Sequence, residues 1–197
     1  MFARIASRAL VLASFLVAGC AASTEEVASV PSTDLDPQAA VHLKGGKRAA
    51  PAFVDLGLAL QATGSLSGLG NGDILVHLEV AGQAYSTCAN PGGGTQPPGQ
   101  NPADVTLSGT QAIPSSQIKN GTVKFGLVTG APPSPVPGAP GCPNAQWSQV
   151  VEDVAFSRAA IIVEQGGAAV LALDCSFSPS TADGAVPAQT MTCTGAQ

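Results

Sequence analysis

Few residues of this chain could do covalent or acid–base chemistry. The 197 residues include five cysteines and two histidines. His77 is expected on the polar face of a strand, and His42 lies upstream of the predicted strands, so neither is placed to act as a general base. The stretch 64–68, GSLSG, has leucine where the nucleophile elbow of a hydrolase carries its serine. A serine hydrolase is therefore not expected.

Carboxylates are the other source of such chemistry, and their spacing does not join them. Glu152 and Asp153 are adjacent in an expected strand, so their side chains point to opposite faces. The sequence has no C-x-x-C pair to hold zinc. We therefore predict a non-enzymatic protein without cofactor or metal. The alternative is an envelope hydrolase or a carbohydrate-processing or carbohydrate-binding module, whose raw material would be Asp73, His77, Glu79, Asp104 and Glu152.

The first nineteen residues have the features of an export signal. Arg4 and Arg8 provide a positive charge, and no charge follows from Ala9 to Val17. That apolar run is too short to span a bilayer core, which takes about 20 residues. Small residues and then Cys20 come next. This order is typical of a secretory signal peptide over residues 1–19.

Val17-Ala18-Gly19-Cys20 closely resembles the lipobox of bacterial lipoproteins. In that family the cysteine thiol is alkylated with diacylglycerol, the chain is cut just before it, and the new amino terminus is usually acylated. The resemblance implies that Cys20 is lipidated and that membrane lipid is a partner. Residue 21 is alanine rather than aspartate, which in this family implies the outer membrane where two membranes are present. The alternative is an ordinary secreted protein cut near Ala22.

Residues 20–52 are predicted to form a lipidated N-terminus and a flexible linker. The segment contains charges and three prolines but no apolar periodicity. A flexible coil of some thirty residues has an r.m.s. reach of roughly 30 Å. Lys44, Lys47 and Arg48 near its end could touch acidic lipids, although a solvated linker is the favoured interpretation.

From Phe53 to Gln197 apolar residues recur with a period of two, which is typical of half-buried strands. In 53–61 the expected inward face carries Val54, Leu56, Leu58 and Leu60. Seven or eight short antiparallel strands predict an all-β sandwich, immunoglobulin-like in outline, with a small barrel as the alternative. The expected strands are 53–61, 73–82, 104–112, 121–130, 147–165 as one bent strand or two, 168–177, and one near 188–194.

Four cysteines remain once Cys20 is assigned to lipid, and disulfides are the default for an even number in an exported protein. Four cysteines allow three pairings. Cys175 and Cys193 both have inward parity on strands expected to form a hairpin, which favours their pairing. That leaves Cys88 with Cys142, a bond that would pin two Pro/Gly-rich loops to the same end of the sandwich.

The loops around Cys88 and Cys142 are predicted to form an interaction end, because loops on a rigid scaffold commonly carry binding sites. The expected partner is an envelope protein or a glycan. For Trp147, packing against the disulfide or the core is the favoured role, and a platform that binds a sugar or peptide is the alternative. The candidate interaction residues are Asn90, Pro91, Gly92, Gly93 and Trp147. Through these residues and the two cysteines, most of residues 66–175 resembles a set of small secreted bacterial proteins of uncharacterised function. The resemblance implies the predicted strands and the Cys88–Cys142 disulfide, but no activity.

The charge of the predicted sandwich argues against nucleic acid as a partner. Between Phe53 and Gln197 there are three basic and nine acidic residues, a net charge of −6. Such a surface repels phosphate.

Overall fold

The computed structural model describes residues 41–46, 49–96 and 102–196. Cys20, the predicted signal peptide and most of the predicted linker lie outside the described residues. Every strand of the described residues belongs to one unit, Thr33–Gln197, of a chain divided after Ser32. Within the described ranges, no helix has the length and apolar character needed to cross a membrane.

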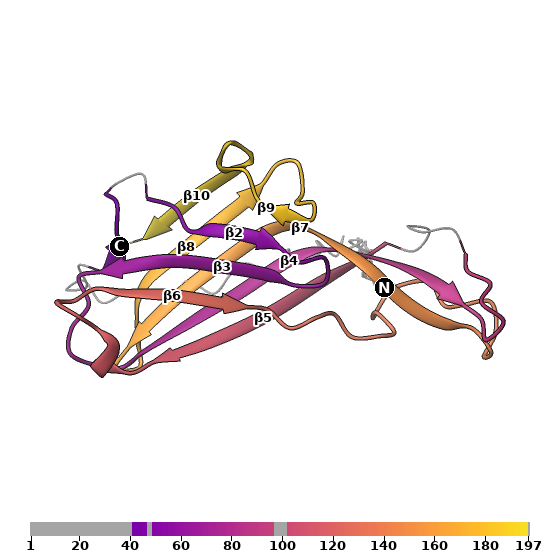
Figure 1. Ribbon diagram of the computed structural model, residues 1–197, viewed down its shortest axis with the longest axis horizontal. Helices are drawn as coiled ribbons and strands as arrows, with labels where there is room; N and C mark the ends of the chain where they lie inside the picture. Colours follow the sequence, from indigo (N-terminus) through magenta and orange to yellow (C-terminus); the bar gives the residue numbers. More distant parts are fainter. Residues whose placement is uncertain (1–40, 47–48, 97–101, 197) are drawn as a thin grey trace, which may run out of the picture. The chain divides into compact units, whose positions relative to one another are not determined.

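Two antiparallel sheets form this unit (Figure 1). In the first sheet, β6 lies along one edge of β3, while β1 and β2 share the other edge and β9 pairs with β2. Its strands are β1 His42–Leu43, β2 Ala52–Asp55, β3 Leu60–Ser67, β6 Val123–Val128 and β9 Gly184–Ala185.

The second sheet has the order β10–β8–β7–β4–β5. Its strands are β4 Ile74–Ala89, β5 Ala103–Ile113, β7 Ser148–Gln165, β8 Ala168–Phe177 and β10 Met191–Ala196. Two short 3₁₀ helices, η1 Ser115–Gln117 and η2 Ala188–Thr190, lie in the connections.

The connectivity confirms the predicted all-β sandwich. Strands β2, β3 and β6 lie together in one sheet, and β8, β7, β4 and β5 follow one another in the other. Immunoglobulin-like sandwiches place strands A, B and E against strands G, F and C in this way, and variable-type domains add a further strand beside C. Not all the strands are short, because β4 has 16 residues and β7 has 18. The segment 147–165 is thus one strand, with register shifts against β4 at Ala81/Gly82 and Tyr85/Ser86.

The core between the sheets is built from small aliphatic residues and a few phenylalanines. Alternate residues of β4 from Ile74 to Val80 are buried, as the periodicity predicted. Phe53 of the first sheet meets Phe177 of the second edge to face, with ring centroids 5.2 Å apart. Phe156 is the largest fully buried side chain.

The prediction of a single strand over 53–61 was wrong. The chain forms β2 and β3 with a tight turn between them, in which Gly57 has a φ of +82°. Leu56, expected in the core, is 52% exposed, whereas Asp55, expected outside, is 3% exposed. The inward face of β2 therefore carries Phe53 and Asp55.

The sandwich also begins earlier than the sequence predicted. Val41 and Leu43 are buried in the core, and β1 pairs with the end of β3. Residues 41–46 and 49–52 thus belong to the folded unit rather than to a linker. About twenty residues, 21–40, separate Cys20 from the first described residue.

Candidate functional site

A two-stranded arm carries the residues predicted to form the interaction end. It consists of residues 85–89 of β4 and 148–153 of β7, which pair with each other from Tyr85–Asp153 to Ala89–Ser148. The neighbouring strands stop short of it, since β5 pairs with β4 only as far as Ala84 and β8 pairs with β7 only from Arg158. In Figure 1 these ends of β4 and β7 continue past the first sheet, toward the loop that follows β4 and the loop that precedes β7.

Cys88 fixes a long loop onto this arm. Its side chain is fully buried and bonded to Cys142, 54 positions later in the chain. The other pair, Cys175 and Cys193, sits at directly opposed positions of β8 and β10. Both pairings favoured by the sequence are therefore present, and neither bond joins the two sheets.

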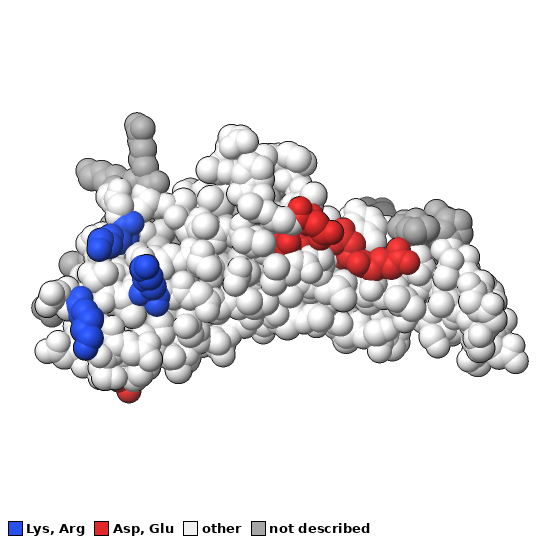
Figure 2. All heavy atoms as spheres, viewed as in Figure 1, with Lys and Arg blue, Asp and Glu red and all other residues white. Residues whose placement is uncertain are grey.

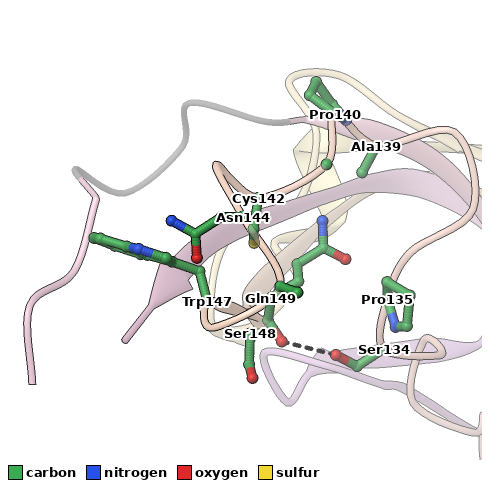
Figure 3. Close-up of a pocket in the computed structure, with 11 residues that line it drawn as sticks. Ser134, Pro135, Ala139, Pro140, Cys142, Asn144, Trp147, Ser148 and Gln149 are labelled. Atoms are coloured by element: carbon green, nitrogen blue, oxygen red, sulfur yellow. Dashed lines mark hydrogen bonds between the residues drawn. The ribbon is translucent and has the colours of Figure 1, made fainter. Parts of the chain in front are cut away.

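Gln149 on the arm holds the same loop at a second point. Its backbone carbonyl accepts a hydrogen bond from the Ser134 hydroxyl at 2.9 Å, and its side-chain Oε1 accepts one from the Val136 N–H at 2.5 Å. Val136 is only 4% exposed and packs into the core. The loop is thus fastened at both ends of a pocket of about 620 Å³ that it forms with the start of β7 (Figure 3).

Trp147 lies at the rim of this pocket. Its backbone N–H donates to the Asn144 carbonyl at 3.1 Å, and Asn144 Oδ1 accepts from the Gln146 backbone N–H at 3.0 Å. A compact turn therefore precedes the indole. The indole is half-buried and extends away from Cys142 and Gln149 (Figure 3). Trp147 does not belong to the buried core, and part of its side chain is exposed to solvent.

The predicted residues Asn90, Pro91, Gly92 and Gly93 form a separate turn at the same end of the arm. The Asn90 and Gly94 backbones are hydrogen-bonded, Asn90 Oδ1 accepts from the Gly94 N–H at 2.9 Å, and Gly93 has a φ of +79°. Pro91, Gly92 and Gly93 are exposed, and none of the four lines the Trp147 pocket. The structure therefore places them beside the pocket rather than in it.

The pocket can support recognition but offers little for acid–base chemistry. Its lining holds amide and hydroxyl groups, prolines, alanines and one indole, and among the described residues it includes no Asp, Glu, His, Lys, Arg or Tyr. Its only cysteine, Cys142, is in a disulfide. These groups suit an uncharged polar ligand that stacks on an aromatic ring.

The residues considered as raw material for a hydrolase do not converge on one site, although His77 and Glu79 lie two positions apart on the outward face of β4. Asp73, just before β4, accepts a hydrogen bond from the Ser115 N–H, which lowers the pKa of its carboxyl. Glu152 accepts from Thr87 near the other end of β4. Fourteen positions of a strand at about 3.4 Å each separate Asp73 from Thr87 by more than 40 Å. Asp104 accepts a hydrogen bond from the Gln83 side-chain amide, and His77 Nε2 lies 3.5 Å from Glu164 Oε1. No two of the five raw-material residues are paired among these contacts.

Sequence reasoning missed a cluster of three aspartates. Asp55, Asp153 and Asp183 come from β2, β7 and the loop before β9, and their carboxylate oxygens lie within 4.8 Å of one another. Asp55 Oδ1 accepts from the Gly57 N–H at 2.9 Å and Oδ2 accepts from the Thr181 hydroxyl. Asp153 Oδ1 is buried without a hydrogen-bond partner in the described chain. Carboxylate oxygens at this spacing could hold a hard cation such as Ca²⁺. Their wide separation in the sequence gave no signal of the cluster.

Burial raises the pKa of Asp55, and the nearby Asp153 and Asp183 raise it further, against the hydrogen bonds from Thr181 and Gly57. A carboxyl whose pKa is raised by folding favours the folded state below its unfolded pKa of about 4, and that contribution is lost as the pH rises through the folded pKa.

We expect Asp55→Asn to stabilise the protein at pH 7 and to give no such gain at pH 3, because the amide keeps an acceptor for Gly57 and carries no charge. Unfolding in denaturant at the two pH values measures the difference. Asp183→Asn, at an exposed member of the cluster, is the matched control and should have a smaller effect. A D55N protein less stable than wild type at pH 7 would contradict the expectation and show that the charge is compensated.

Comparison with known proteins identified no similar protein or family. A scan against protein-family models, a search of curated proteins and a search of solved structures each returned no match. The functional conclusions therefore depend on the residues of this chain.

Proposed function

We propose that this protein is a lipid-anchored cell-envelope protein that presents a non-catalytic binding module. The observation that carries the proposal is the sequence Val17-Ala18-Gly19-Cys20, placed directly after a short uncharged run and ahead of the sandwich. The two disulfides fit this location, because such bonds persist in oxidising compartments outside the cytosol.

The position of the Trp147 pocket supports a presenting role. The described chain begins at Val41 next to β1, which pairs with the end of β3 at Ser67. A short connection leads from there to the start of β4 at Ile74, and the pocket lies beyond the other end of β4. The end at which the described chain begins and the pocket thus lie at opposite ends of the longest strands.

The groups that line the pocket define the class of ligand that we propose. Asn144, Ser148 and Gln149 offer hydrogen-bonding groups, and Trp147 offers an aromatic face. An uncharged glycan or an extended peptide of the envelope has both the polar groups and the flat apolar surfaces that these side chains complement.

Intact-mass analysis of the protein isolated from its native membrane tests the anchor. We expect a mature chain that starts at Cys20 and carries the added mass of acyl groups. A mature N-terminus downstream of Cys20 without acyl mass would contradict the proposal and would make the protein a freely diffusing exported domain.

A further inference from the structure

Three lysines gather at the end of the sandwich where the described chain begins. Lys44, Lys119 and Lys124 are all exposed, and we name them the lysine patch. Figure 2 shows basic side chains gathered at one end of the visible face, with a small acidic group at the lower margin of the same end, while the larger acidic group extends from the middle of the face toward the other end. The three lysines line one pocket of about 500 Å³, whose other lining residues are uncharged.

Strand pairing brings two of these lysines together. The Lys44 N–H donates to the Ser65 carbonyl at 2.8 Å, and Ser65 lies directly opposite Lys124 in the pairing of β3 with β6. Strands are spaced by about 4.8 Å, so the two lysine backbones flank Ser65 at roughly 10 Å from each other. Leu43 and Val123, the neighbours of these lysines in the chain, are buried, so the lysines are on the outward face.

A tight turn adds the third lysine. Lys119 and Thr122 exchange two backbone hydrogen bonds around Asn120 and Gly121, both of which have positive φ values. Asn-Gly is typical of such a turn, because both central positions need a positive φ. The Thr122 hydroxyl lies 3.4 Å from that of Ser67, so the turn is held against the end of β3.

Two acidic residues, Asp73 and Glu164, lie at the same end of the sandwich as the patch, but neither forms an ion pair with a patch lysine. In the described part of the chain the fourth basic residue is Arg158, which is bonded to Asp174, whereas none of the three lysines forms an ion pair. The same ranges contain nine acidic residues, and none of them lines the lysine pocket. An acidic protein thus concentrates three of its four described cations at one end.

We propose that the lysine patch docks on the anionic headgroups of the membrane that holds Cys20. The inference depends on the lipid anchor proposed above. Lys44 lies three positions after the first described residue, and about twenty residues join that residue to Cys20. With the flexible linker predicted from the sequence, a chain of this length has an r.m.s. reach of about 25 Å, which keeps the patch close to the headgroups.

A weak attraction is sufficient in this arrangement, because the anchor already makes the contact intramolecular. Each lysine near an anionic surface raises the ratio of docked to undocked protein by about fivefold, so three lysines raise this ratio by about 100-fold at low salt. Docking would fix which end of the sandwich faces the lipid. The Trp147 pocket would then face outward instead of sampling all orientations.

Labelling of lysines in the acylated protein tests this inference. The wild-type protein is reconstituted in vesicles of phosphatidylcholine alone or with about one third phosphatidylglycerol, and an uncharged amine-acylating reagent is added. We expect Lys119 and Lys124 to be labelled at least about fivefold more slowly in the anionic vesicles, as read by mass spectrometry, and the protection to disappear at about 0.5 M salt.

Two controls separate docking from other effects of the vesicle charge. A Gln146→Lys variant places a reporter on the exposed loop near Trp147, and this lysine is expected to be labelled equally in both vesicle types. Lys44→Gln should weaken the protection of the other two patch lysines by about fivefold, whereas Lys44→Arg, which keeps the charge, should preserve it.

The outcomes are distinguishable. If the patch lysines are labelled equally in both vesicle types while the protein stays bound, docking is wrong and the anchor stands. If the protein floats free of phosphatidylcholine vesicles, the anchor itself is wrong. If protection requires an added acidic envelope protein rather than phosphatidylglycerol, the patch is a protein interface and the lipid assignment is overturned.

Discussion

Replacing Cys20 with serine is expected to move the protein from the membrane fraction to the soluble fraction and to abolish incorporation of labelled fatty acid. Several acyl chains at about 0.8 kcal/mol per buried methylene give a firm anchor, and without the thiol there is no sulfur to carry the diacylglycerol. Fractionation of the native host, with immunodetection of both fractions, measures the change.

The uncut chain has to be separated from the mature one in this experiment, because residues 1–19 could retain a chain at the membrane if they are not removed. Intact mass identifies each species. Ala22→Ser is the matched control and should leave the protein acylated and membrane-bound. A Cys20→Ser protein that lacks residues 1–19 and still sediments with membranes would show that another feature anchors it.

Loss of the Cys88–Cys142 bond is the second large expected effect. The bond closes a loop of 54 positions, so in the chain-entropy account the Cys88→Ser/Cys142→Ser variant loses about 4 kcal/mol of stability. For a domain of this size that loss lowers the Tm by roughly 10 °C. Calorimetry under oxidising conditions measures it. Because the bond fastens the loop before Trp147, we also expect the single tryptophan to become more accessible to an aqueous quencher.

The matched control is the other disulfide. Cys175→Ser/Cys193→Ser removes a bond that closes 18 positions, for which the expected loss is about 3 kcal/mol. That bond lies between β8 and β10, away from the Trp147 pocket, so this variant should lose stability without a change in tryptophan quenching. Equal changes in quenching in the two variants would contradict a local role for Cys88–Cys142.

Period-two alternation was a reliable guide where a strand is long and has one buried face. Ile74 to Val80 in β4 and Val123 to Leu127 in β6 lie as the pattern predicted, because a single register satisfies all their apolar side chains. The pairing of Cys175 with Cys193 followed from the same parity.

The alternation misled in the stretch from Phe53 to Leu60, where the apolar residues continue through a turn. Leu56 extends the pattern but lies in the turn beside Gly57, whose positive φ ends β2. Asp55 then takes an inward position because Thr181 and Gly57 donate hydrogen bonds to it. A polar residue that finds its partners 126 positions away cannot be recognised from local spacing.

Tertiary contacts also decided the features that sequence reasoning missed at the two ends of the sandwich. Ser86 and Thr87 are buried in the arm although they are polar, so the apolar alternation that predicted β4 ends before the strand itself does. Lys44 was assigned to the linker because β1 has only two residues and gains its place by pairing with β3. The lysine patch could not be seen until that strand was placed.

The length of β4 has a consequence for what the protein can touch. Sixteen residues at about 3.4 Å each make a rod of roughly 50 Å, and the paired strand β7 stiffens it along its whole length. In the docked state proposed above, this rod would act as a spacer between the lipid and the opposite end of the sandwich. The indole at its tip would meet polymers and proteins that stand well above the bilayer, and targets lying flat among the lipids would be out of its range.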